Sequence, residues 1–230
     1  MTAAREVQTH EARPLRQYRQ CYCRYRPARR WGAGDRGHSR VPPQAIASSV
    51  TRAPELMERA WRLPAAATFH RQVSWQSNGS RCGPAAVANA YRSLGEAANT
   101  EDKVLAGTSR CWTGVCFLGL TLDELAEVAR VNTSRKVTVL RDLSEEQFRE
   151  HLHRSNDASR RYVVNFNREQ IFGAGVGHHS PIGGYLEAED LVFVLDVNSD
   201  YQPWLVERKR LFEAVNTFDG DKKRGLLLIE

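Results

Sequence analysis

The spacing of apolar residues changes along this chain, and this change constrains the fold more than any other feature. Up to about residue 154 most apolar residues recur at helical spacing, whereas from about residue 162 they run in short blocks typical of strands. Helical segments followed by consecutive strands predict an α+β fold with an antiparallel sheet. We expect two lobes, a helical one and a sheet one, with a cleft between them.

The predicted elements have recognisable ends. A proline opens the first helix, a capping box of Thr121 and Glu124 opens the third, and Gly95 ends the second. The predicted helices are Pro54–Arg62, Ala85–Leu94, Thr121–Val131, Ser144–Arg154 and Glu207–Val215. The predicted strands are Lys136–Leu140, Tyr162–Phe166, Ile182–Leu186, Leu191–Val197 and Gly225–Ile229, with a hairpin connection at Glu187–Asp190.

Residues 1–43 differ in composition from the rest of the chain. They carry ten of the 33 basic residues and three of the 27 acidic ones, which leaves residues 44–230 with a net charge of −1. The segment has no apolar run, so we expect a disordered tail followed by one globular domain over residues 44–230. A near-neutral domain gives no reason to expect a nucleic-acid partner; a tail that binds RNA or a membrane surface stays an alternative.

Signals for export and for membrane insertion are absent from the sequence. No run of about 18 apolar residues exists, so no membrane partner is expected. The pair Arg29–Arg30 is followed by a polar, glycine-rich stretch and not by the apolar core of a signal peptide. We therefore expect a cytoplasmic protein.

Five cysteines argue against a disulfide framework, because their number is odd and no export signal accompanies them. Cys21 and Cys23 lie in the expected tail, and neither they nor Cys111 and Cys116 have the spacing of a zinc site. We expect no metal site in the protein.

The remaining cysteine, Cys82, has the setting of a nucleophile. It precedes a predicted helix, and the partial positive charge at a helix N-terminus lowers a thiol pKa. The segment Gly175–Pro181 reads as a turn that presents a histidine, and the strand before Asp196 ends in that carboxylate. Cysteine, histidine and a polar orienting residue follow in the order of a papain-like nucleophile, base and orienter.

Four segments together resemble the phytochelatin synthase family, the glutathione γ-glutamylcysteinyltransferases of the papain-like clan. The resemblance covers roughly residues 50–230, and its most specific part is the string Gly-x-Gly-His-x-Ser-Pro-Ile-Gly-Gly-Tyr. The matching segments are Gln76–Gly83, Gly175–Tyr185, Val194–Val197 and Lys223–Ile229.

The resemblance implies a role for individual residues. Carried over by position, it implies a nucleophile at Cys82, a general base at His178, an orienting carboxylate at Asp196, an oxyanion glutamine at Gln76, and substrate contacts at Gly177 and Asp219. His179, which follows the implied base, is expected to line the cleft. The fold implied is the papain-like one, with the cysteine on the helical lobe and the histidine and aspartate on the sheet lobe.

The implied reaction is cleavage of the Cys–Gly bond of glutathione through a γ-glutamylcysteinyl thioester on Cys82. A second glutathione or water then takes the acyl group. The expected partners are glutathione and its metal complexes, because a soft ion such as Cd(II) or Zn(II) arrives bound to glutathione thiolates. No tightly bound cofactor is expected, and a homodimer stays open.

One departure from the family pattern concerns the acceptor. The segment Val197–Trp204 lacks the basic residues that the family carries there, which favours water over glutathione as the acceptor. Two other functions stay open at this point. One is a general papain-like cysteine peptidase, and the other is a non-enzymatic metal-binding protein that uses Cys82, His178 and His179.

Overall fold

A computed structural model of the chain describes residues 41–108 and 119–230, and these residues belong to one compact unit. The predicted disordered tail therefore lies outside the described residues, apart from residues 41–43. Val41 is buried in the core and Pro43 begins the first helix, so the folded part starts slightly before the predicted boundary. Four of the five cysteines, Cys82 being the exception, also lie outside the described residues.

The central sheet contains, within these residues, six strands in the order β1-β8-β2-β3-β4-β5, and every pairing is antiparallel. The strands are β1 (Val137–Arg141), β2 (Arg161–Asn167), β3 (Gly177–Leu186), β4 (Leu191–Val194), β5 (Trp204–Glu207) and β8 (Gly225–Ile229). A separate hairpin joins β6 (Phe218–Asp219) to β7 (Lys222–Lys223).

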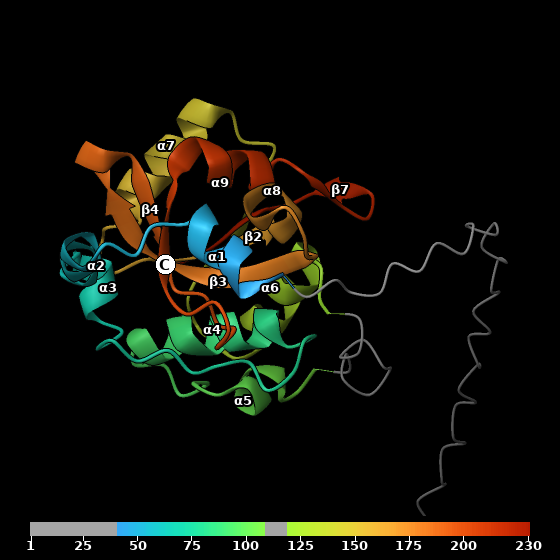
Figure 1. Cartoon of the computed structure of the whole chain (residues 1–230). Coiled ribbons are helices and arrows are strands. Elements are labelled where there is room, and N and C mark those ends of the chain that lie inside the picture. The colour runs from blue at the N-terminus through green and yellow to red at the C-terminus, as the bar shows by residue number, and fades with distance from the viewer. Residues whose placement is uncertain (1–40, 109–118) are drawn as a thin grey trace, which may run out of the picture. The chain divides into compact units, whose positions relative to one another are not determined.

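Helices cover both faces of the sheet (Figure 1). One face packs on α1 (Pro43–Ser49), α7 (Glu145–Arg154), α8 (Arg168–Phe172) and α9 (Arg208–Val215). The other packs on α2 (Pro54–Trp61), α3 (Pro64–Ala67), α4 (Cys82–Ser93) and α6 (Leu122–Val131), and α5 (Glu101–Leu105) packs on α4 and α6. None of the helices described here is long and apolar enough to cross a membrane.

Side chains of the inner strands alternate between these two faces. In β4 and the residue after it, Val192 and Val194 pack in the cluster with α7 and α9, whereas Phe193 and Leu195 pack in the cluster with α2 and α3. Because both faces are covered, the strand is apolar at every position, as the uninterrupted run in the sequence predicts. The α+β fold class is confirmed.

Two predicted boundaries near the cysteine and histidine motifs are wrong. Helix α4 begins at Cys82 and not at Ala85, because the first turn of a helix needs no partner for its N–H groups and therefore accepts Pro84. Strand β3 begins at Gly177, within the segment predicted as a turn, because residues 177–182 pair with β2. Both changes place reacting groups on regular elements and not on loops.

Candidate active site

Cys82 is the first residue of α4 and is 6% exposed. No side chain caps this helix end, so the partial positive charge there is not offset by a capping oxygen. Leu125 of α6 packs against Gly83, where an added Cβ would lie 3.0 Å from Leu125 Cδ1. The glycine therefore allows α6 to hold the start of α4 in place.

His178 and Asp196 form a buried pair on the sheet. His178 Nε2 lies 2.9 Å from Asp196 Oδ1, and neither side chain is more than 2% exposed. This bond uses one ring nitrogen, so Nδ1 of His178 remains for the thiol. The sequence prediction that these two residues act together is consistent with their direct contact.

Further donors hold the Asp196 carboxylate in place. Arg168 Nη2 donates to both carboxylate oxygens, at 3.1 and 3.2 Å, and Trp204 Nε1 donates to Oδ2 at 3.2 Å. The backbone N–H of Asn198 donates to Oδ1 at 2.9 Å. Burial alone would raise the pKa of Asp196, but the charges of His178 and Arg168 together with these bonds hold it far below its ordinary value. The carboxylate is therefore ionised at any pH at which the protein works.

Arg168 is a site residue that sequence reasoning missed. Its guanidinium lies over the ring of Tyr201, 3.8 Å from the ring centroid, and is buried with the carboxylate it binds. Because arginine side chains are mostly exposed in proteins, no local sequence pattern predicts that this one is buried. Trp204, which also bonds to Asp196, is fully buried in the core.

The two neighbouring histidines lie on opposite sides of β3, as successive residues of a strand do. His178 packs edge-on against Phe166, with 5.6 Å between the ring centroids, on the face that carries Asp196. His179 Nδ1 lies 3.8 Å from Cys82 Sγ, on the face that packs against α4. His179 therefore contacts the thiol directly, whereas His178 influences it through its charge and hydrogen bonding.

Electrostatics favour an ion pair between the thiol and His178. Burial is the largest single influence on the pKa of Cys82 and would raise it. The charge of His178 and hydrogen bonding to it, with a smaller contribution from His179, outweigh burial and hold this pKa well below its ordinary value. Burial and Arg168 lower the pKa of His178, but Asp196 and the thiolate raise it overall. A thiolate opposite an imidazolium is the resting state of an activated cysteine nucleophile.

Gln76 is attached to the chain beside Asp196. Its backbone N–H donates to Val197 O at 2.8 Å, and its Nε2 donates to Asn78 O at 2.7 Å. The next residue, Ser77, bonds through N and Oγ to Glu101 of α5, at 2.8 and 2.6 Å. The amide of Gln76 retains a second N–H, because a side-chain amide carries two.

Gly177 and Asp219 meet at a third residue, Arg224, which sequence reasoning did not select. Arg224 Nη1 donates to Asn165 Oδ1 at 2.9 Å and lies 3.3 Å from Asp219 Oδ2, which also accepts from Asn165 Nδ2 at 3.0 Å. A Cβ on Gly177 would lie 2.4 Å from Arg224 Nη1, so only glycine lets the guanidinium lie there. Arg224 also interacts with the charge of Cys82, which places a cation near the thiol.

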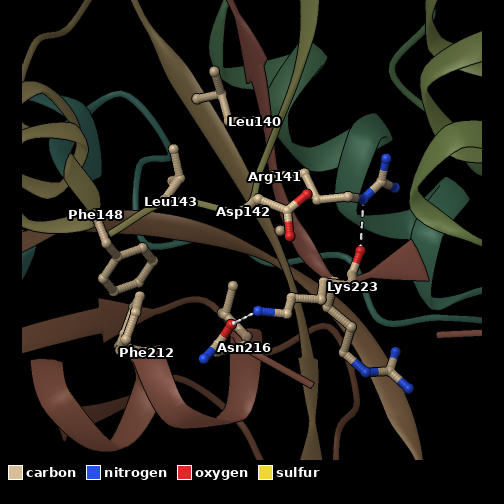
Figure 2. A pocket seen from close by; sticks show the side chains of 11 residues that line it. Leu140, Arg141, Asp142, Leu143, Phe148, Phe212, Asn216 and Lys223 are labelled. Atoms are coloured by element: carbon tan, nitrogen blue, oxygen red, sulfur yellow. Dashed lines mark hydrogen bonds between the residues drawn. The ribbon is translucent and has the colours of Figure 1, made fainter. Parts of the chain in front are cut away.

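The described residues contain hollows of very different size. The pocket in Figure 2 lies where Leu140 and Leu143 approach Phe148 and Phe212, and its volume of about 10 Å³ suits one water and not a peptide. Two larger hollows, of about 470 and 550 Å³, share the wall residue Trp75, next to Gln76. Neither of these two hollows is lined by Cys82, His178 or Asp196.

Comparisons with known proteins point in one direction. Residues 37–226 match the family model described as phytochelatin synthase. The chain is 29% identical over 117 residues to a glutathione gamma-glutamylcysteinyltransferase of Schizosaccharomyces pombe, covering 49% of this chain and 28% of that protein. It is 32% identical over 117 residues to such an enzyme of Lotus japonicus, covering 48% of this chain and 24% of that protein. It is 39% identical over 70 residues to one of Arabidopsis thaliana, covering 29% of this chain and 14% of that protein. The chain thus spans less than a third of the length of these relatives.

Among solved structures, the chain is similar to the peptidase domain of Streptococcus ComA, a bi-functional ABC transporter involved in quorum sensing. The sequence identity is 14% and the TM-score is 0.48, with 69% of this chain and 96% of that chain covered.

Proposed function

The chain belongs to the phytochelatin synthase family, and on that premise we propose that it is a thiol acyltransferase that cleaves the Cys–Gly bond of glutathione. The observation that carries this proposal is the buried thiol of Cys82 at the start of α4, together with the His178–Asp196 pair. Relatives named glutathione gamma-glutamylcysteinyltransferases support the choice of substrate.

In the first half of the proposed reaction the Cys82 thiolate attacks the carbonyl carbon of the Cys–Gly bond. The backbone N–H of Cys82 and the second N–H of Gln76 are the proposed oxyanion donors. As the C–N bond breaks, the His178 imidazolium gives its proton to the departing amine of glycine. The product is a γ-glutamylcysteinyl thioester on Cys82 and a neutral His178, which Asp196 keeps oriented.

In the second half neutral His178 accepts a proton from the acyl acceptor as it attacks the thioester. Attack by the amine of a second glutathione gives a longer (γ-Glu-Cys)n-Gly peptide, and attack by water gives γ-glutamylcysteine. In both cases Cys82 leaves as a thiolate and His178 regains its proton, so the resting pair is restored.

The residues after Asp196 favour water over glutathione as the acceptor of the acyl group. The stretch Asn198–Gln202 carries no basic residue that could hold the carboxylate of a second glutathione. Arg52 does reach this loop, but it donates to the carbonyl oxygens of Tyr201 and Pro203. We therefore propose that hydrolysis exceeds chain extension.

Charged groups beside the thiol suit a charged substrate. Arg224 and Asp219 offer a cation and an anion near Cys82, and glutathione carries both carboxylates and an ammonium group. A metal ion enters as part of the substrate, in a glutathione thiolate complex. For the metal-binding alternative, the described residues contain no cluster of three or more His, Cys, Asp or Glu side chains that could hold an ion.

The proposal is tested by incubating the full chain with glutathione, with and without Cd(II), and following products by mass spectrometry. We expect γ-glutamylcysteine as the main product, no product from Cys82→Ala, and full activity from Cys21→Ala as the matched control. The tripeptide α-Glu-Cys-Gly, which lacks the γ-linkage, should not be cleaved. Its cleavage at the same rate would indicate a general peptidase, and a folded protein that yields neither product from glutathione would refute the proposal.

A further inference from the structure

His179 contacts the reacting sulfur, yet the proposed reaction assigns it no step. It is 3% exposed, and its Nδ1 lies 3.8 Å from Cys82 Sγ, within the range of a hydrogen bond to sulfur. Its neighbour His178 is bonded to Asp196 from the opposite side of β3, so the two rings have different partners. A buried imidazole at a nucleophile needs an explanation of its own.

The environment of the second ring nitrogen selects one tautomer. His179 Nε2 is buried and has no hydrogen-bond partner. A proton on Nε2, in the other tautomer or in the imidazolium, would be a buried donor without an acceptor, which is costly. With the proton on Nδ1, Nε2 is left only as an unpaired acceptor, and the ring directs an N–H and not a lone pair at the thiolate.

We propose that His179 is a second catalytic imidazole, which donates a hydrogen bond from Nδ1 to the Cys82 thiolate and takes no part in proton transfer. This deepens the proposed function by dividing two tasks between adjacent residues of one strand. His178 carries the proton that moves, and His179 stabilises the thiolate as nucleophile and as leaving group. The hydrogen bond is made to the charged sulfur and weakens when the sulfur is acylated, so it favours release of the thioester.

Other charged groups around the thiol stay unchanged when His179 is replaced. They come from β3 (His178), from the segment after β4 (Asp196), from α8 (Arg168) and from the residue before β8 (Arg224). Asp219 pairs with Arg224 at the edge of this group. A difference in the Cys82 alkylation profile between variants at position 179 therefore reports the hydrogen bond from His179 to the sulfur and not these charges.

The test is the pH dependence of Cys82 alkylation by iodoacetamide in the full chain, read from the Cys82 peptide by mass spectrometry so that other cysteines do not contribute. We expect His179→Phe, which keeps a planar ring without an N–H, to raise the apparent thiol pKa by about one unit, a tenfold loss of thiolate on the acid side. His151→Phe, the same change beside Tyr162, should leave the profile unchanged.

A second pair of variants keeps the test decisive if phenylalanine disturbs packing. Asparagine and leucine have similar shapes, but only asparagine offers an N–H near the position of Nδ1. His179→Asn should retain most of the wild-type profile and His179→Leu should not. Equal profiles for these two variants, or a ¹⁵N spectrum that places the ring proton on Nε2, would overturn the proposal. Alkylation uses no glutathione, so its outcome is independent of whether glutathione is the substrate.

Discussion

At the scale of single residues, the site depends on small side chains that let charged ones approach. Gly177 opens β3 and has the Arg224 guanidinium against its backbone, where a Cβ would lie 2.4 Å from one terminal nitrogen and 2.8 Å from the other. The guanidinium is buried and bound to Asn165 and Asp219, so it has little freedom to move aside.

We therefore expect Gly177→Ala to displace Arg224 and weaken glutathione binding. The loss of hydrogen bonds to a charged group predicts an increase of about tenfold in KM, with a smaller change in kcat. Steady-state kinetics measure both constants. Gly79→Ala, where a Cβ meets no atom within 4 Å, is the control, and an unchanged KM for Gly177→Ala would show that Arg224 does not bind substrate.

The candidate catalytic residues could be selected from the sequence more readily than the charged residues around them. Cys82, His178 and Asp196 could be selected because their order along the chain and the motif around them specify a chemistry. Arg168 and Arg224 could not, because the burial of a charge depends on partners brought from other elements. The separate role proposed for His179 could not be predicted either, because it depends on how β3 pairs with β2 and on which face of the strand each histidine lies.

At the scale of elements, local signals identify the longer helices and miss several of the shorter elements. Helices α6 and α7 have capping boxes at Thr121 and Ser144 and lie where the sequence predicts them. Helix α8 has five residues and β5 has four, too few for a period to be recognised. These short elements nevertheless supply Arg168 and Trp204 to the carboxylate of Asp196.

Ser144→Ala should remove the cap of α7 without changing the chemistry of the site. Ser144 Oγ accepts from Gln147 N at 3.1 Å, and loss of such a cap costs about 1 kcal/mol of unfolding free energy. Urea denaturation followed by circular dichroism measures this loss, and the alkylation profile of Cys82 should not move. Ser48→Ala, on the exposed end of α1, is the control and should have the same midpoint as the wild type. A wild-type midpoint for Ser144→Ala would mean that the capping box contributes nothing measurable.

At the scale of the whole molecule, the reactivity of one thiol depends on segments from across the sheet. Cys82 comes from α4, His178 from β3 and Asp196 from the chain after β4, while α8 and β5 fix the carboxylate. The pKa of His178 is raised by Asp196, and the imidazolium in turn lowers the pKa of Cys82.

Asp196→Asn should therefore shift the alkylation profile of Cys82 to higher pH. Without the carboxylate, His178 loses its proton at lower pH, and the thiol pKa rises toward its ordinary value of about 8.5. The wild type keeps Cys82 as a thiolate at pH values below its ordinary pKa. In the variant the sulfur is protonated in that pH range. We expect a shift of at least one pH unit, with Asp200→Asn as the exposed control. An unchanged profile in a protein that circular dichroism shows to be folded would contradict the coupling.

The strand order also bears on how the molecule is made. Strand β8 lies between β1 and β2, which precede it by several elements in the chain. During synthesis the edges of β1 and β2 that pair with β8 therefore stay unpaired until every intervening segment has been translated. Arg224 adjoins β8, so the cation near the thiol arrives with the strand that closes the sheet. A nascent chain on the ribosome would thus hold Cys82 without this neighbouring cation until β8 has been translated.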